Sequence, residues 1–263
     1  RLQAAGARPA VVLRGYGADE VLVHRQLNPT IPVIANADRV TGARQAREAG
    51  ATVVVLDDAF QHRRARRDVD LVLLSADRSG PVRSLPAGPW REPLASLARA
   101  HVVAVTRKQA SLLRAKELLA SAMRFAPGAH GVVIHLLMDA VVPVSGGSPS
   151  PLASLRGVPV LAVSGIGDPR AFQSQLRTAG ALVTAGAYAD HHPFSRRDVA
   201  SIVRTAGEHL RPVCTLKDAV KLAPLWPAQA PPLWYLSQRA DVEVGGGAMQ
   251  AVVEQLAARA RSI

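Results

Sequence analysis

The chain has 263 residues, of which 48% are hydrophobic and 4% aromatic. This apolar content excludes a disordered or fibrous chain, and the single cysteine, Cys214, excludes a disulfide framework and a multi-cysteine metal site. The formal net charge of +12, from 32 basic and 20 acidic residues, favours polyanionic partners such as anionic lipid headgroups, phosphorylated substrates or nucleic acid. No apolar run approaches the roughly 18 residues that a membrane-spanning helix needs.

Short apolar runs alternate with helical patterns in chain order. Strands are predicted at 9–13, 52–56, 70–74, 101–105, 159–163, 212–215 and 233–236. Helices are predicted at 40–49, 110–125, 169–179, 199–209 and 248–261. Strands that are apolar on both faces, with helices between them, are typical of a parallel sheet. The sequence therefore predicts an α/β fold whose mostly parallel sheet is flanked by helices.

The middle of the chain interrupts this alternation. Residues 143–151 read PVSGGSPSP and predict a loop or linker. Two short β-prone pieces are expected just before it, within 131–144, on either side of Asp139. After the linker the α/β pattern resumes, and Ser195 with Asp198 predicts a capping box ahead of a helix.

The first motif with possible chemistry is the pair Asp57 and Asp58, which directly follows an apolar strand. Ligands of open α/β folds bind at the carboxyl edge of the sheet, and an acid at that edge can hold Mg²⁺ beside phosphates. The simpler interpretation is a polar strand end followed by a turn. Gln61 and His62 just beyond add polar groups that a simple turn does not need.

The second motif is residues 14–20, RGYGADE, which also follows a strand. Asp19 in this position could orient a hydroxyl group and accept its proton. The alternative is an ordinary turn in which Asp19 only caps a helix.

The third motif is residues 188–194, YADHHPF. Adjacent histidines do not naturally aim both rings at one metal ion, so a histidine paired with a carboxylate is the better functional interpretation. The alternative is a surface loop that leads into the helix starting near Ser195.

The remaining motifs contribute single basic residues. Arg91 lies in the proline-rich stretch 85–93, and Arg39 opens a predicted helix. Arginine suits bidentate contact with phosphate, and Lys217, at a strand-to-helix turn, could meet a nucleotide. The simpler interpretations are a surface Arg–Glu pair, helix-end electrostatics, and a capped helix with solvated lysines.

These motifs, in this order, closely resemble the tetraacyldisaccharide 4′-kinase family of lipid A biosynthesis over residues 11–222. The most specific pieces are DDAFQH at 57–62 and LPAGPWREPL at 85–94. The resemblance implies a P-loop-NTPase-like α/β kinase with a smaller C-terminal α/β domain. It implies a kinase core at 1–128, a β linker at 129–151 and the C-terminal domain at 152–263.

The resemblance also implies the reaction and its site. ATP with Mg²⁺ would phosphorylate the 4′-hydroxyl of the lipid A disaccharide 1-phosphate, at the cytoplasmic face of the inner membrane of Gram-negative bacteria. We expect a monomer that binds this anionic membrane surface and no nucleic acid. By motif position, Asp19 and His191 are catalytic, Asp57 and Asp58 hold the metal, Gln61 and Lys217 bind the cofactor ATP, and Arg14, Glu20, Arg39, Arg91 and Glu92 bind the substrate. Whether His191 or His192 pairs with Asp19 stays open.

The sequence departs from the family pattern in several places. No lysine follows a glycine, so the Walker A pattern GxxxxGK[ST] is absent from the 263 residues, as is the expected N-terminal apolar helix. Ala18, Ala59 and Leu216 replace residues common in the family. We therefore expect an N-terminally truncated kinase lacking its first β-α unit, poorly active alone. The alternative is a non-enzymatic remnant that binds anionic lipid or phosphorylated glycolipid.

Overall fold

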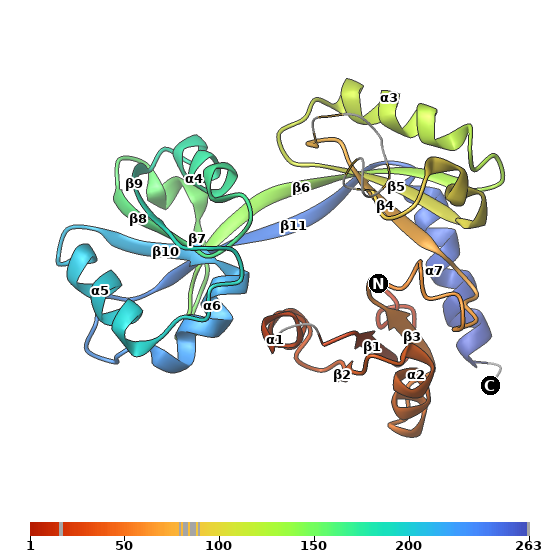
Figure 1. The fold of residues 1–263 in the computed structure, drawn as a ribbon, viewed down its shortest axis with the longest axis horizontal. Helices are drawn as coiled ribbons and strands as arrows, with labels where there is room; N and C mark the ends of the chain where they lie inside the picture. The colour runs from red at the N-terminus through yellow and green to blue at the C-terminus, as the bar shows by residue number, and fades with distance from the viewer. Residues whose placement is uncertain (16–17, 79, 81–83, 85–87, 89, 262–263) are drawn as a thin grey trace. The chain divides into compact units, whose positions relative to one another are not determined.

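The structure is a computed structural model that describes residues 1–15, 18–78, 80, 84, 88 and 90–261 (Figure 1). Its contacts divide the chain into two compact units. Unit 1 comprises Arg1–Gly15, Asn28–Leu137 and Ala240–Ile263, and unit 2 comprises Tyr16–Leu27 and Met138–Arg239.

Unit 1 begins with a small parallel sheet in the order β2-β1-β3. All five residues of β1 are buried, as expected for a central apolar strand. The predicted strand at 9–13 is confirmed, and the helix predicted at 40–49 starts one residue earlier, behind the cap Asp38. The elements of this part are β1 (Pro9–Leu13), β2 (Val33–Ala35), α2 (Arg39–Glu48) and β3 (Val53–Leu56).

The rest of unit 1 is a parallel sheet covered by a helix on each face. Alternate residues of β5 point to opposite faces, so Val103 packs in the cluster that contains Leu119 of α3, and Val102 packs with Val252 of α7. Two strands, β6 and β11, continue into unit 2. The elements are β4 (Leu71–Ser75), η1 (Leu94–Arg99), β5 (Val102–Arg107), α3 (Leu112–Met123), β6 (His130–Pro143), β11 (Trp234–Val244) and α7 (Gly246–Arg261).

Unit 2 is built in the same way around three parallel strands. Helices α4 and α5 lie on opposite sides of these strands (Figure 1). Phe172 of α4 packs on one face of the strands, and Val199 of α5 packs on the other. Helix α1 contacts α6 within this unit. Its elements, besides parts of β6 and β11, are α1 (Ala18–Leu27), β7 (Ser150–Pro151), η2 (Leu152–Leu155), β8 (Pro159–Ser164), α4 (Pro169–Thr178), β9 (Leu182–Ala187), α5 (Arg196–Ala206), β10 (Arg211–Thr215), α6 (Leu216–Leu222) and η3 (Ala223–Leu225).

The predicted fold class is confirmed. The larger sheet has the order β4-β5-β6-β11-β10-β8-β9, with β7 beside β6, and the pairs β4–β5, β5–β6, β8–β9, β8–β10 and β10–β11 are parallel. The domain boundaries at 128 and 151 stay a prediction. The contacts group α7 with unit 1 and α1 with unit 2.

One predicted feature of the middle segment is wrong. The expected two β-prone pieces around Asp139 form one uninterrupted strand, β6. The side chain of Asp139 is about half exposed and pairs with Arg239 at 3.5 Å, so the carboxylate stays in solvent without breaking the strand. The strand predicted at 233–236 likewise extends to Val244, and the sequence prediction missed α1, β2 and β9.

Among the described residues, no helix is both long and apolar enough to cross a bilayer.

Gly42 of α2 tests how tightly this helix packs on β1. A Cβ at Gly42 would lie 2.6 Å from Cγ1 of Val12, a contact that forces atoms apart. Overpacking costs about 1–3 kcal/mol, which outweighs the helix preference of alanine over glycine of at most ~1 kcal/mol. We therefore expect Gly42→Ala to lower the free energy of unfolding in urea. Gly247→Ala in α7, where the Cβ meets nothing within 4 Å, is the control and should not destabilise. Equal stability of both variants would contradict this packing.

Candidate functional site

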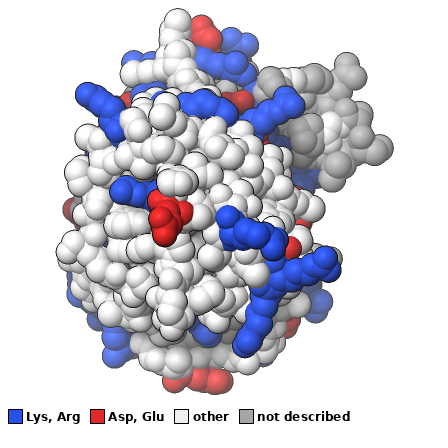
Figure 2. Space-filling view, turned by 90° about the vertical axis from the view of Figure 1, so that its left-hand side faces the viewer, with Lys and Arg blue, Asp and Glu red and all other residues white. Residues whose placement is uncertain are grey.

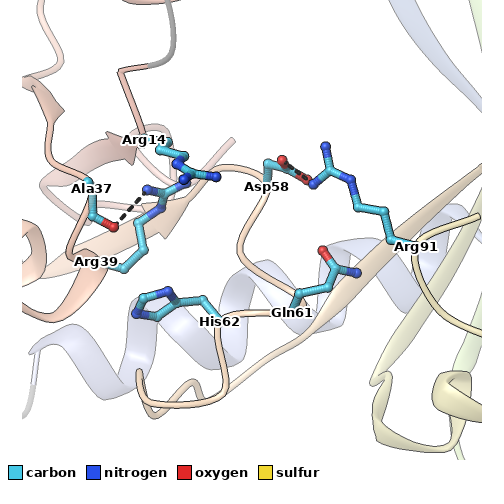
Figure 3. A pocket seen from close by; sticks show the side chains of 7 residues that line it. All are labelled: Arg14, Ala37, Arg39, Asp58, Gln61, His62 and Arg91. Atoms are coloured by element: carbon cyan, nitrogen blue, oxygen red, sulfur yellow. Dashed lines mark hydrogen bonds and ion pairs between the residues drawn. The ribbon is translucent and has the colours of Figure 1, made fainter. Parts of the chain in front are cut away.

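Unit 1 has a pocket of about 310 Å³ beyond the carboxyl ends of β1, β2 and β3 (Figure 3). Parallel strands bring the residues that follow them to one edge of the sheet, which is where α/β folds bind ligands. Five of the predicted site residues line this pocket. The lining residues are Arg14, Ala37, Arg39, Asp58, Gln61, His62 and Arg91.

Arg39 is the buried cation of this pocket. Only 4% of the residue is exposed. Its guanidinium donates hydrogen bonds to the carbonyl oxygens of Asn36 and Asp57, both at 3.1 Å. Its Nε has no hydrogen-bond partner among the described residues. A buried guanidinium bonded to neutral carbonyls retains its charge, so it favours an anion in the pocket.

Arg91 and Asp58 form an ion pair at the rim of the pocket, with Nη1 and Oδ2 2.6 Å apart (Figure 3). Their side chains are 60% and 62% exposed, so the pair contributes little to stability and an anionic ligand can compete for Arg91. Asp58 also has a φ of +48°. In the described part of the chain only one other non-glycine residue, His191, has positive φ. Such backbone strain concentrates at functional sites.

Asp57 and Asp58 are the predicted metal-binding carboxylates. Both are exposed at the end of β3. No cluster of three or more His, Cys, Asp or Glu side chains suited to a metal occurs in the ranges that the structure describes. Mg²⁺ is usually held by one or two carboxylates together with water and substrate phosphates. The donor set therefore fits Mg²⁺ that arrives with a phosphate, and it does not form an all-protein metal cage.

The structure gives the neighbours of two further residues from these motifs, and the predicted role of Glu92 stays a prediction. Glu92, predicted to bind substrate, accepts a hydrogen bond from Arg99 at 2.7 Å. Partial burial raises the pKa of Glu92, but the hydrogen bond from Arg99 outweighs burial with the help of Ser96, so the pKa is lowered. His62, which the sequence analysis noted without assigning it a role, lines the pocket with its Nε2 4.0 Å from Asp38. Its position directly after Gln61 was the available signal.

Unit 2 contains the predicted catalytic pair. Asp19 lies in the first turn of α1, and its side chain is only 7% exposed. Its Oδ2 is 3.5 Å from Nδ1 of His191 and 3.7 Å from Nζ of Lys217. Oδ1 accepts a hydrogen bond from the backbone N–H of Glu20. A nearly buried carboxylate is thus held between an imidazole and an ammonium group.

His191 is fixed by its backbone. Its φ is +57°, a conformation that non-glycine residues rarely adopt. Its N–H lies within hydrogen-bond distance of the carbonyl oxygen of Gly165, at 3.1 Å, and of Oδ1 of Asp190, at 3.0 Å. These contacts hold the left-handed turn that directs the ring to Asp19.

The neighbouring histidine has a different partner. His192 Nε2 lies 3.3 Å from Oδ2 of Asp198, and its ring packs against Tyr188 and Phe194. The geometry therefore singles out His191 as the neighbour of Asp19. The catalytic roles themselves stay predictions.

The other predicted residues divide between the units. Lys217, predicted to bind the nucleotide, has its ammonium 3.0 Å from Nε2 of His191. Its nucleotide role stays a prediction, and its observed neighbours are Asp19 and His191. Glu20 lies beside Asp19 in α1. Asp57 belongs to unit 1, whereas Asp19 and His191 belong to unit 2.

The mostly parallel sheet, with carboxylates and arginines beyond its strand ends, defines an α/β protein with a candidate anion-binding site. In fold, the chain is similar to a crystal structure of LpxK from Aquifex aeolicus in complex with ATP. The TM-score is 0.72, and the match covers 98% of this chain and 80% of that chain at 23% sequence identity.

Sequence comparison identifies the family. The family model for LpxK, the tetraacyldisaccharide-1-P 4′-kinase, matches residues 17–258. Tetraacyldisaccharide 4′-kinase of Stenotrophomonas maltophilia is 35% identical over 240 residues, covering 84% of this chain and 67% of the relative. That of Nitrobacter winogradskyi is 36% identical over 244 residues, with the same coverage of 84% and 67%. The chain belongs to this family and is by family a kinase, and it spans about two thirds of the length of these relatives.

Asp198 gives unit 2 a predictable dependence on pH. Hydrogen bonds from the hydroxyl and backbone N–H of Ser195, with the contact to His192, lower the pKa of Asp198 below its usual 3.8. A lowered folded-state pKa stabilises the fold above pH 3.8, and this contribution disappears as pH falls through the folded pKa. We expect Asp198→Asn to lose about 1 kcal/mol of unfolding free energy at neutral pH, because the hydrogen bonds of the capping box weaken, and to approach wild type in acid. Urea unfolding across pH measures this, with the exposed Asp241→Asn as control. A deficit that does not change with pH would contradict the assignment.

Proposed function

We propose that the protein transfers the γ-phosphate of ATP, with Mg²⁺, to the 4′-hydroxyl of the tetraacyldisaccharide 1-phosphate in lipid A biosynthesis. Family membership supports the reaction class. The observation that carries the proposal is Asp19, a nearly buried carboxylate beside His191 and Lys217. A carboxylate held in this way suits the acceptance of a proton from an attacking hydroxyl.

The acceptor step needs a residue that takes one proton. As the 4′-oxygen forms its bond to the γ-phosphorus, the bond from that phosphorus to the bridging oxygen of ADP breaks. The hydroxyl proton passes to Asp19. Lys217 balances the charge of the carboxylate before the transfer, and His191 helps to keep the carboxylate oriented.

The phosphate groups would be bound by the arginines of unit 1. Arg39 brings a buried guanidinium to the pocket, and Arg14 and Arg91 add two more (Figure 3). Guanidinium groups bind phosphate oxygens through paired hydrogen bonds. Asp57 and Asp58 would hold Mg²⁺, which neutralises charge on the transferring phosphate when bound. Gln61 lines the pocket and is proposed to contact the nucleotide. We propose that Glu20 and Glu92 bind the substrate.

We also propose that the 263-residue chain alone turns over poorly. It contains no GxxxxGK[ST] segment. In P-loop kinases the backbone N–H groups and the lysine of this segment hold the β- and γ-phosphates. One lost charged hydrogen bond is worth ~1.5–3 kcal/mol, so the loss of several slows transfer by orders of magnitude.

The proposed location is the cytoplasmic face of the inner membrane, with the protein bound peripherally as a monomer. The net charge of +12 supports attraction to anionic headgroups, at ~1 kcal/mol for each basic residue near the surface. Three arginines that follow the DDAFQH motif at 57–62 are exposed, namely Arg63, Arg64 and Arg66. On the face shown in Figure 2, basic side chains are more abundant than acidic ones.

Transfer of ³²P from ATP to the tetraacyldisaccharide 1-phosphate tests the function. The product of the natural gene is assayed beside the 263-residue chain, with anionic vesicles present. We expect activity from the gene product, little from the 263-residue chain, and a loss of about 10²–10⁴-fold on Asp19→Asn because the proton acceptor is removed. Asp139→Asn, which changes an exposed carboxylate of unit 2, should leave activity unchanged. Full activity of Asp19→Asn would overturn the assignment of Asp19.

The second candidate function is a non-enzymatic remnant that binds anionic lipid or phosphorylated glycolipid. The excess of basic residues and the buried Arg39 favour it. The same experiment separates the two functions. A gene product that sediments with the vesicles but transfers no phosphate would favour the remnant.

A further inference from the structure

We propose that Lys217 is a positioning residue that fixes the tautomer of His191, so that the ring presents an N–H to Asp19. This inference depends on the proposed role of Asp19 as the proton acceptor. In this role Lys217 acts by orienting His191, and it does not need to contact the nucleotide.

The hydrogen-bond chemistry of the three groups determines the tautomer. The ammonium group of Lys217 has donors and no acceptor. It lies 3.0 Å from Nε2 of His191, so Nε2 must be the ring nitrogen without a proton. The proton of a neutral imidazole is then on Nδ1. Nδ1 is the nitrogen that faces Oδ2 of Asp19, at 3.5 Å.

Charge favours the same arrangement. An imidazolium ring would carry a proton on Nε2 and would direct it at the positive ammonium of Lys217. The ammonium itself lies 3.7 Å from Oδ2 of Asp19 and balances that carboxylate, which is nearly buried. Lys217 therefore compensates the charge of Asp19 and leaves His191 as a neutral, oriented donor.

The turn at Gly165 helps to position both Lys217 and His191. Asp218, fully buried in α6, accepts hydrogen bonds from the Thr215 hydroxyl at 2.7 Å and from the N–H of Gly165 at 3.1 Å. The carbonyl oxygen of the same Gly165 accepts from the N–H of His191. A Cβ at Gly165 would lie 3.3 Å from Oδ1 of Asp218 and 3.2 Å from Cβ of His192, which leaves little room for a side chain. Gly165 therefore links the start of α6, through Asp218, to the turn that contains His191.

Nitrogen NMR of the histidine rings tests the proposal directly. The 263-residue chain is labelled with ¹⁵N-histidine and measured at alkaline pH, where imidazole rings are neutral. His191→Gln assigns the signals of His191. We expect wild type to show a pyridine-like Nε2 and a pyrrole-like Nδ1. Lys217→Met should shift the Nε2 signal toward the pyrrole-like position as the other tautomer becomes populated, and Lys217→Arg should preserve the wild-type pattern.

The controls separate this role from a loss of structure. His192, with Asp198 as its partner, should keep its signals in Lys217→Met, and the exposed Lys116→Met should leave both histidines unchanged. If Lys217→Met unfolds unit 2, the spectra of wild type and Lys217→Arg show which tautomer His191 adopts. A protonated Nε2 in wild type, or a His191 tautomer unaffected by Lys217→Met in a folded protein, overturns the proposal. The readout needs no turnover, so it is independent of whether the chain is a kinase.

Discussion

The carboxylate of Asp19 is the group on which the chemistry of unit 2 depends. A carboxylate that is only 7% exposed has lost most of its water and needs charged or hydrogen-bonding partners. Here the partners come from distant parts of the sequence, His191 from the turn after β9 and Lys217 from α6. The contact between α1 and α6 brings them together, so helix packing and acid–base chemistry are coupled in this unit.

Unit 1 shows a comparable relation between fold and charge. Its pocket exists because three parallel strands end at the same edge, and Arg39 is buried there against carbonyl oxygens. Among the described strands, β3 and β4 each lie at the edge of a sheet. Val55 of β3 and Leu73 of β4 are 43% and 61% exposed. Exposed apolar side chains on an edge strand favour pairing with a further strand.

Periodicity predicted the elements whose residues face a core on both sides. Strands β1 and β8, and the capping box of Ser195 and Asp198, follow from local residue types alone. Strand β9, with the sequence LVTAGA, was missed because most of its residues are exposed and the sequence lacks a clear apolar run. Helix α1 was missed because its two faces differ little in polarity, so only its contact with α6 shows why it is a helix here.

The site was predicted in its residue types but not in its partners. Motif order placed Asp19 and the histidine pair in one hypothesis, yet only three-dimensional packing distinguishes His191 from His192. Lys217 was assigned to the nucleotide because a lysine at a strand-to-helix turn is typical of phosphate contact. That role stays a prediction. The neighbours that the structure shows are His191, 26 residues earlier, and Asp19, further still, and no local pattern could reveal these contacts.

A double-mutant cycle on the free energy of unfolding tests most directly whether Lys217 compensates a buried Asp19. Asp19→Asn, Lys217→Met and the double variant of the 263-residue chain are unfolded in urea at neutral pH. Removing Lys217 alone leaves a nearly buried carboxylate without its cation, whereas removing both leaves no charge to compensate. The double variant should therefore be more stable than the sum of the single effects predicts, by about 0.5 kcal/mol or more. Additive effects of the two substitutions would contradict the coupling.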